Sequence, residues 1–473
     1  MKPIRLLDSQ RFLSETDSRA VAERVFPFAR GGGETRVQVG SWWQGELRWA
    51  RNRVSLASDR REVVVTIVRV VAGGPGYATT NQLDDVSLES AVRAAERSAD
   101  FSRAEPSSQY DAPPPVYEYP KTAIWSDATY GLSTEARGEL ARGLIDAPES
   151  KGMLSAGYME MRARTLADFS SAGVKAIEPE RPYVRWTQAQ CSTTVRDPKG
   201  TGSGWAGLSS YDWASIDGPA LGERALQKCL ASRNPVALEP GRYTVILEPQ
   251  AVADLMQLFT IAFQRWVAEE GRGPFALAYD DALKIWRSKL GIKVVDERIT
   301  ISHDPADPAL GIVLDPGLGT GPVTWIDRGV LTNLYHYRHT YALPKLNDHL
   351  GIRELTGYRM SGGDTSVDEM IATTKRGLLV TRFSNTRGLD PTSVLSTGLT
   401  RDGLWLVENG KISKAVKNFR FTESPLFVLN SIEQLGVPVP VFRPTRTGGE
   451  LTPAIVPPLK VRDFSFTSAI DAI

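Results

Sequence analysis

Two long segments with side chains that alternate with a period of two residues restrict the fold of this chain most strongly. Between residues 153 and 211, large polar side chains alternate with smaller or apolar ones, and residues 34–80 show a similar pattern. The polar set includes Tyr158, Glu160, Arg162 and Arg164, and the intervening residues are Met159, Met161, Ala163 and Thr165. Successive side chains of a strand point to opposite faces of a sheet, so the pattern predicts strands with one buried face.

Helical patterns interrupt these strands without a regular alternation. One apolar helical face consists of Leu88, Ala91, Val92, Ala95 and Ala99. We expect Ser87 to be the N-cap of this helix, and Arg93 and Glu96 to lie on its solvated face. Ser133 predicts the start of a second helix. Because strands and helices do not alternate regularly, the expected fold class is α+β.

A segment with two prolines and a glycine, at residues 233–241, separates a helical pattern from a strand pattern. It predicts a domain boundary, with a mixed α/β N-terminal domain at residues 1–234 and a C-terminal domain dominated by antiparallel sheet at residues 235–473. Asn409 and Gly410 indicate a hairpin in the second domain, since type I′ turns need positive φ at both positions.

One helix is expected early in the second domain, at about residues 249–270. Pro249 suits its first turn, and Gly271 marks its end. A shorter helix is expected at residues 366–376, and a hairpin at residues 326–330.

The charge balance and the scarcity of His and Cys exclude several classes of protein. The chain has 56 Lys and Arg against 55 Asp and Glu, a net charge of +1, so no basic field points to nucleic acid. With only 2 Cys, Cys191 and Cys229, a disulfide framework is not expected. No apolar run is long enough for a signal sequence or a membrane span, so we expect a cytoplasmic protein.

The residues with potential chemistry form no recognisable motif. His336 and His339 lie in an apparently extended segment, where a spacing of three places them on opposite faces. We interpret them as polar or packing residues, with a site made by His336, His339 and His349 as the metal-binding alternative. Cys191 has no activating base nearby in the sequence, so it is interpreted as a partly buried thiol instead of a nucleophile.

Several stretches in a fixed order resemble the TldD/PmbA family. They are residues 52–59, 76–85, 377–383, 397–403, 407–412, 416–421 and 461–464. The resemblance covers nearly the whole chain. It implies two related subunits that form a zinc peptidase acting on short or unfolded peptides, including precursors of modified peptide antibiotics. One subunit type carries His-Glu-x-x-x-His on a helix and a late Cys, whereas the other type lacks this metal set.

In this chain the positions that correspond to the family's metal set hold other residues. The segment 253–271 contains no histidine, and no Cys follows Cys229. By the resemblance, Met256, Gln257 and Ile261 stand where the two His and the Glu would be, and Met256 and Ile261 are interpreted as apolar packing residues. The resemblance therefore implies a metal-free subunit with no cofactor of its own.

These observations lead to one functional hypothesis and two alternatives. The chain is expected to be a chamber-forming, substrate-handling subunit that pairs with a zinc-bearing TldD-like paralogue as a heterodimer, or with itself, and acts on peptides and not on nucleic acid or membranes. The candidate chamber residues are Arg382, Arg387, Asp390, Thr397 and Thr400, whose alternative interpretation is strand-surface and turn residues. The functional alternatives are a non-enzymatic, peptide-binding homodimer and a peptidase with an unrecognised site.

Overall fold

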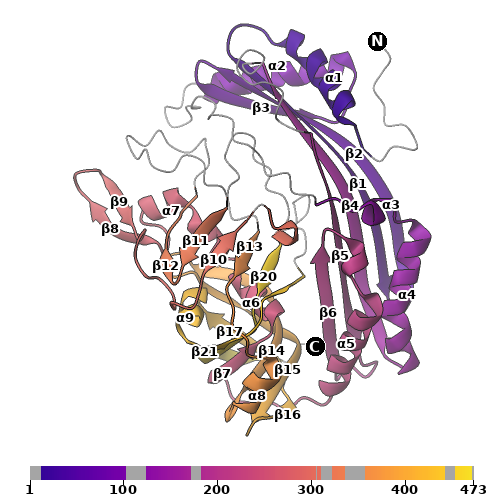
Figure 1. The fold of residues 1–473 in the computed structure, drawn as a ribbon, viewed down its shortest axis with the longest axis vertical. Helices are drawn as coiled ribbons and strands as arrows, with labels where there is room; N and C mark the ends of the chain where they lie inside the picture. Colours follow the sequence, from indigo (N-terminus) through magenta and orange to yellow (C-terminus); the bar gives the residue numbers. More distant parts are fainter. Residues whose placement is uncertain are drawn as a thin grey trace.

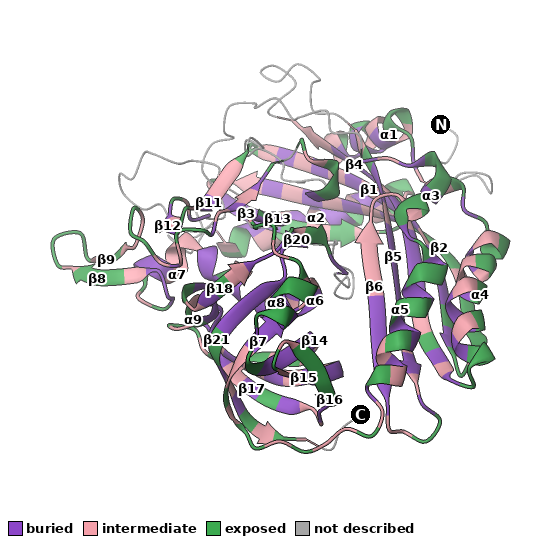
Figure 2. Cartoon of the chain, turned by 60° about the horizontal axis from the view of Figure 1, so that its bottom comes forward, coloured by how far each residue is buried: buried purple, intermediate pink, exposed green. Residues whose placement is uncertain are grey.

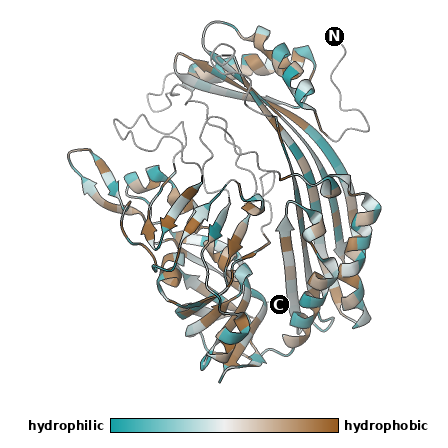
Figure 3. Cartoon of the chain, in the orientation of Figure 1, coloured by the Kyte–Doolittle hydropathy of each residue, from teal (hydrophilic) through white to brown (hydrophobic). Residues whose placement is uncertain are grey.

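One six-stranded antiparallel sheet organises the first half of the chain (Figure 1). The computed structural model describes residues 12–102, 124–171, 183–304, 306–310, 322–335, 357–442 and 453–470. The strands of this N-terminal sheet are β1 (Glu34–Ala50), β2 (Arg53–Val71), β3 (Gly74–Thr80), β4 (Leu154–Ser170), β5 (Val184–Arg196) and β6 (Ser203–Ser210), in the order β3-β2-β1-β4-β5-β6. Figure 3 shows hydrophobic and hydrophilic residues interleaved along the long strands, as the period of two predicts.

Helices cover one face of this sheet. They are α1 (Glu15–Val25), α2 (Asp85–Ser102), α3 (Asp127–Gly131), α4 (Thr134–Ser150) and α5 (Gly218–Ala231), with the short 3₁₀ turns η1 (Phe26–Phe28) and η3 (Trp213–Ser215). Helices α4 and α5 lie on the outer side of the curved sheet and turn their exposed residues away from it (Figure 2). Trp43, Leu47 and Met159 from this face of the sheet join Leu144 and Ala225 of these helices in one buried core.

The capping predictions for two helices have different outcomes. Ser133 caps α4, since its side chain accepts a hydrogen bond from the Ala136 backbone, as predicted. The prediction for Ser87 is wrong. Helix α2 begins at Asp85, and the Asp84 side chain accepts a 2.9 Å hydrogen bond from the Ser87 backbone. Asp and Ser are comparable N-caps, so the helical pattern alone does not decide between them.

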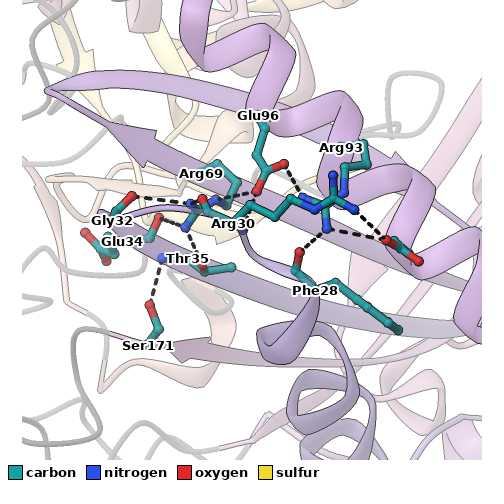
Figure 4. Close-up of polar contacts among 10 residues, drawn as sticks. Phe28, Arg30, Gly32, Glu34, Thr35, Arg69, Arg93, Glu96 and Ser171 are labelled. Atoms are coloured by element: carbon teal, nitrogen blue, oxygen red, sulfur yellow. Dashed lines mark hydrogen bonds and ion pairs between the residues drawn. The ribbon is translucent and has the colours of Figure 1, made fainter.

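The polar side of α2 is also less solvated than expected, because it closes over a buried arginine (Figure 4). The Arg69 side chain is 1% exposed and donates to Thr35 Oγ1 at 2.6 Å and to the Arg30 carbonyl at 2.8 Å. Glu96 lies 3.6 Å from Arg69 and also pairs with Arg93. A buried arginine is stable only with such partners. Glu96 of α2 therefore contacts the sheet and does not extend into solvent.

A closed barrel forms the centre of the second half. Its strands are β7 (Gly241–Leu247), β14 (Arg376–Asp390), β15 (Leu395–Glu408), β17 (Phe419–Glu423) and β21 (Leu459–Ala469). They pair in the order β14-β7-β21-β17-β15, and β15 pairs again with β14, which closes the ring. Strand β16 (Lys411–Ala415) extends β15, and β18 (Ile432–Leu435) pairs with β21. Because the ring is closed, the backbone N–H and C=O groups of every barrel strand form hydrogen bonds along its paired length.

Aromatic residues fill this barrel and its neighbourhood. Phe383 lies 4.5 Å from Phe421 and 5.7 Å from Phe464, measured between ring centroids. Phe419 and Phe466 are 5.1 Å apart. All of these rings are buried, so the barrel is a packed core and not a pore.

A second sheet and a projecting hairpin complete this half. The sheet has the order β12-β11-β10-β13-β20-β19. Its strands are β10 (Ile301–His303), β11 (Val323–Asp327), β12 (Val330–Leu331), β13 (Tyr358–Met360), β19 (Val439–Pro440) and β20 (Ala454–Val456), and the hairpin is β8 (Ala276–Asp280) with β9 (Ile285–Ser288). The remaining elements are α6 (Pro249–Met256), η4 (Phe259–Phe263), α7 (Arg265–Glu269), η5 (Pro308–Leu310), α8 (Val367–Ala372) and α9 (Pro425–Asn430).

Most of the predicted elements of this half are present. Asn409 and Gly410 have φ of 50° and 78° and turn β15 into β16, and Arg328 and Gly329 form the turn of the expected 326–330 hairpin. Strand pairs other than β7–β14 and β13–β20 are antiparallel, which confirms the α+β class with a largely antiparallel second half. Among the described residues, no helix is long and apolar enough to cross a membrane.

Candidate functional site

The face of the N-terminal sheet that none of the described helices covers presents a set of polar side chains in register. Across β1 and β4, Glu46 lies opposite Glu160, and Arg48 lies opposite Tyr158. A pocket of about 430 Å³ opens on this face. It is lined by Trp42, Gln44, Glu46, Arg48, Arg60, Glu62, Tyr158, Glu160, Arg162 and Arg164, which we call the polar face. The same alternation that sends Trp43 and Leu47 into the helical core sends these residues to the opposite side.

Two carboxylates of the polar face are buried and well partnered. Glu46 and Glu160 are 3% and 7% exposed. Gln44 Nε2 and Gln190 Nε2 donate to Glu160 at 2.8 and 2.9 Å, and Arg162 Nε lies 2.7 Å from the same carboxylate. Glu46 forms an ion pair with Arg48. Two facing carboxylates repel each other unless cations offset their charge, so the arginines stabilise this arrangement.

Tyr158 extends the network toward β5. Its hydroxyl donates to Gln190 Oε1 at 3.1 Å. Burial, followed by the negative charge of Glu160, raises the pKa of the Tyr158 hydroxyl well above its ordinary value. The phenol therefore stays protonated at physiological pH and serves as a hydrogen-bond donor, not as a base.

One residue of the second half, Phe442, packs onto this face. Its ring centroid lies 6.1 Å from that of Tyr158 and 5.6 Å from that of Trp205 on β6. The Gln250 side chain of α6 holds the Phe442 backbone on both sides, because it donates to the carbonyl at 3.0 Å and accepts from the amide at 3.1 Å. Helix α6 is thus linked to the polar face through a single residue.

The α6 segment differs from the continuous helix expected at about residues 249–270. Pro249 begins α6 as predicted, but α6 ends at Met256 and is followed by the separate elements η4 and α7. The rings of Phe259 and Phe263 are both buried and lie 5.1 Å apart. Both rings also pack against Phe275, and Phe263 packs against Trp325, so tertiary packing outweighs helix propensity here.

The three positions that the resemblance assigns to the metal set do not suit zinc. Met256 is 1% exposed and packs in the core, as predicted, whereas Ile261 is 46% exposed, so its predicted packing role is wrong. Gln257, the C-cap of α6, is partly exposed. Zinc requires thiolate, imidazole or carboxylate ligands, and this trio offers none.

The acidic residues in and near these elements already have protein partners. Asp254 accepts from the Phe383 backbone at 3.0 Å and from Gln250 at 2.9 Å, and Glu269 pairs with Arg265 at 2.7 Å. Within the described residues, no group of three or more His, Cys, Asp and Glu is placed to hold a metal ion. His336, His339 and His349 lie outside the described residues.

Both cysteines are buried in the core between the N-terminal sheet and its helices. Burial raises the pKa of the Cys191 thiol to about 12, and that of the Cys229 thiol to about 11. A thiol with such a pKa is almost entirely protonated at neutral pH and is a poor nucleophile.

The structure spreads the five predicted chamber residues along the β14–β15 hairpin. Arg382 points at the N-terminal sheet, with its guanidinium carbon 4.6 Å from the Trp205 ring centroid. Arg387 is exposed and lies opposite Thr397, whose hydroxyl donates to the Phe421 carbonyl. Only Arg382 among them meets the first half of the chain.

The other two predicted chamber residues have local partners. Thr400 is buried and bonds to Asn418 Oδ1 at 3.0 Å and to the Phe419 amide at 2.9 Å. Asp390 accepts from Thr392 and Ser393 in the hairpin turn, and these hydrogen bonds lower the pKa of its carboxyl to about 2. These contacts agree with the alternative interpretation, in which the residues stabilise strands and turns. The sequence pattern did not identify the polar face as a candidate site, although the alternation of Tyr158, Glu160 and Arg162 indicated that such a face exists.

A six-stranded sheet with one helical and one polar face, joined to a closed barrel and a second sheet, defines a two-domain α+β class of protein. Residues 240–468 match the family model described as "PmbA/TldA metallopeptidase C-terminal domain". The second half of the chain therefore matches a domain of the PmbA/TldD family. A comparison with curated protein sequences gives no match.

Solved structures share this fold over nearly the whole chain. A crystal structure of a proposed modulator of a DNA gyrase from Thermotoga maritima aligns with a TM-score of 0.74 and 18% identity, covering 95% of this chain and 100% of that one. A crystal structure of a proposed modulator of DNA gyrase from Bacteroides thetaiotaomicron aligns with a TM-score of 0.75 and 18% identity, covering 96% of this chain and 100% of that one. The crystal structure of TldE from Thermococcus kodakarensis aligns with a TM-score of 0.71 and 18% identity, covering 96% of this chain and 99% of that one.

Proposed function

We propose that this chain is the metal-free subunit of a TldD/PmbA-type peptidase and that a zinc-bearing paralogue supplies the catalytic centre. One observation carries the proposal. The α6–η4 segment is present and is linked to the polar face through Gln250 and Phe442, but it holds Met256, Gln257 and Ile261 in place of metal ligands. A segment retained without its ligands fits a role in assembly and substrate handling.

In this proposal the polar face handles the peptide. Its hydrogen-bonding groups are fixed by the network around Glu160, so they are organised before a peptide arrives. Peptides held through backbone groups and a polar surface are bound with little dependence on sequence, which suits short or unfolded substrates. Arg382, Arg387, Asp390, Thr397 and Thr400 stay proposed chamber residues, with Arg382 best placed because it meets Trp205.

The proposed domains are residues 1–234 and 235–473. The bridge between Val236 and Val416 supports this boundary, because it pairs residue 236 with the segment just before β17. The barrel follows from β7 onward.

Co-expression with the zinc-bearing paralogue of the same genome tests the function. Cleavage of an unstructured peptide is assayed with each subunit alone and with both. We expect full activity only with both, and we expect zinc in the paralogue. Full activity of the paralogue alone would remove the partner role. Activity of this chain alone would favour a peptidase with an unrecognised site, and peptide binding without cleavage in any combination would favour the non-enzymatic homodimer.

A matched pair of variants links the activity to the polar face. Glu160→Gln removes the charge that Arg162 pairs with and disturbs the network, whereas Arg97→Ala changes an exposed residue of α2. We expect Glu160→Gln to raise KM for the peptide in the paired enzyme, and Arg97→Ala to leave KM unchanged. If the KM of the Glu160→Gln enzyme equals that of the unchanged enzyme, the peptide does not use this face.

A further inference from the structure

The hairpin of β8 and β9 projects from the second half of the molecule. It extends beyond the barrel and the second sheet in two different views (Figure 1 and Figure 2). Within the described part of the chain, β8 and β9 pair only with each other. A two-stranded hairpin is marginally stable by itself in water, so packing against another surface would stabilise it. We call residues 276–288 the arm.

The root of the arm is fixed to the body of the protein. Gly271 has a φ of 73°, and a Cβ added there would lie 2.4 Å from the Trp286 indole, so the arm packs closely on this glycine. The Lys289 amide donates to the Phe275 carbonyl at 2.7 Å. The Tyr279 ring packs beside Trp286, with the two ring centroids 6.1 Å apart. The arm therefore has a fixed direction, and binding through it loses little conformational entropy.

The arm carries apolar side chains that the fold leaves exposed. Leu277 is 47% exposed, Tyr279 is 49% exposed and Leu283 is 63% exposed. Apolar residues scattered singly over a surface need no explanation, but these three share one projecting element. Such a grouping is typical of a surface that packs against another protein.

The charges of the arm balance each other in number. Its acidic residues are Asp280 and Asp281, and its basic residues are Lys284 and Arg287. The Asp280 carboxylate accepts from two amides of the turn, at 3.0 and 3.1 Å. Asp281, Lys284 and Arg287 are exposed and form no ion pair or hydrogen bond with any residue that the structure describes. Charges of both signs are thus available to a partner.

This balance makes the arm complementary to a second copy of itself. In a dimer with two-fold symmetry the same surface serves both subunits, so residue i of one copy meets residue j of the other, and the reverse contact also forms. Asp281 of each copy can then lie beside Lys284 of the other. The net charge of +1 adds little repulsion between two copies of the chain.

We propose that two copies of this chain associate about a two-fold axis through their arms. Leu277, Tyr279 and Leu283 pack across the axis, and Asp281 of each copy pairs with Lys284 of the other. The inference goes beyond the proposed function and does not depend on it, since it concerns contacts between identical chains. The arm is smaller than a standard interface of about 800 Å² per partner, so the association should be in the micromolar range.

Charge reversal tests the symmetric pairing with the full chain alone. Sedimentation velocity from about 1 to 100 μM measures the association. Asp281→Lys and Lys284→Asp should each weaken it about tenfold or more, because like charges then meet twice across the axis. An equal mixture of the two variants should recover the affinity of the unchanged chain, because both contacts then join a lysine to an aspartate. Arg97→Asp, an equal change of charge on exposed α2, is the matched control and should have no effect.

The apolar contact is tested by a second pair of variants. Leu283→Ser should weaken the association, whereas Phe101→Ser should leave it unchanged, although Phe101 on α2 is 82% exposed. All the altered residues are exposed, and circular dichroism spectra equal to that of the unchanged chain confirm that the variants are folded.

Several outcomes would overturn the inference. A chain that stays monomeric at about 100 μM, or single charge variants that associate normally, would exclude the arm as the contact. A mixture that fails to recover the association would exclude the two-fold pairing of Asp281 with Lys284. If the arm variants prevent binding of the zinc-bearing paralogue and leave self-association intact, the arm binds the paralogue and the inference is wrong.

The inference and the proposed function fail separately. Self-association through the arm, without peptide cleavage in any combination with the paralogue, would support the inference and remove the proposed function. Cleavage by the paired enzyme, with this chain monomeric when alone, would do the reverse.

Discussion

The guanidinium carbon of Arg382 lies 4.6 Å from the centroid of the Trp205 ring and joins the barrel to the N-terminal sheet. Arg382 is on β14 and Trp205 is on β6, nearly two hundred positions earlier in the sequence. Phe442 packs on the same indole from the second half. Two residues of the second half thus contact one aromatic side chain of the first.

Removal of this stacked arginine should weaken the contact between the two halves. Arg382 is 23% exposed, so its cation–π contact is partly desolvated, and Arg382→Ala should lower the free energy of unfolding by about 1–2 kcal/mol. Arg382→Lys should recover only part of this, because an ammonium group does not stack like a planar guanidinium. Urea unfolding followed by circular dichroism measures the change. Arg376→Ala, at the exposed start of β14, is the control, and an equal effect in both alanine variants would contradict the prediction.

The hydrogen bond between Ser203 and Asp402 should also stabilise the contact. The Ser203 hydroxyl donates at 2.6 Å to a carboxylate of a residue that is 3% exposed. Ser203→Ala leaves that carboxylate with one donor fewer, which should cost about 1–3 kcal/mol of unfolding free energy. Exposed Ser413 donates at 2.9 Å to the partly exposed Glu408, so Ser413→Ala is a matched surface control with an expected loss below about 0.5 kcal/mol. Similar losses in both variants would show that the buried bond is unimportant.

The two cysteines should be unreactive in the folded protein. Burial raises the thiol pKa of Cys191 to about 12 and that of Cys229 to about 11. Ellman's reagent at pH 8 should therefore detect no thiol in the native protein and both thiols in urea. Reaction of the native protein within minutes would show that the core opens easily.

The same pKa shifts predict how stability depends on pH. An unfolded cysteine has a pKa of about 8.5, below the folded values, so ionisation favours the unfolded state at alkaline pH. The stabilisation is fully present below about pH 8.5 and falls as the pH rises toward the folded values. Unfolding free energies measured from pH 7 to 10 should decline, and Cys191→Ala should reduce the slope. An unchanged slope would assign the decline to other groups.

Introducing His, Glu and His at Met256, Gln257 and Ile261, the positions that the resemblance assigns to the metal set, should not create zinc binding. In a variant with Met256→His, Gln257→Glu and Ile261→His, the first histidine would be buried, whereas position 261 is 46% exposed and follows the end of the helix. No thiolate is available as the third ligand, since no Cys follows Cys229. Metal analysis should show less than stoichiometric zinc, and Met256→His alone should cost about 1–3 kcal/mol of unfolding free energy. Stoichiometric zinc in the triple variant would show that the segment can re-form one helix.

Local patterns were sufficient to predict the main strands and several turns. The alternation around Glu160 requires a strand with two different faces, and Asn409 with Gly410 requires a hairpin, because both depend on backbone geometry over a few residues. The α6 region shows the limit of such patterns. Its composition suits one long helix, but the burial of Phe259 and Phe263 against distant aromatic residues favours a break.

The sequence by itself determined the α+β class and the two faces of the long strands, because these depend on residue types and their spacing. Only the tertiary structure decided that Glu46 and Glu160 face each other and that Phe442 links α6 to the polar face. These features depend on strand register and on which strands become neighbours. Contacts between residues far apart in the chain set the strand register and the choice of neighbouring strands. The period-two pattern of the sequence is the same in every register, so it does not determine them.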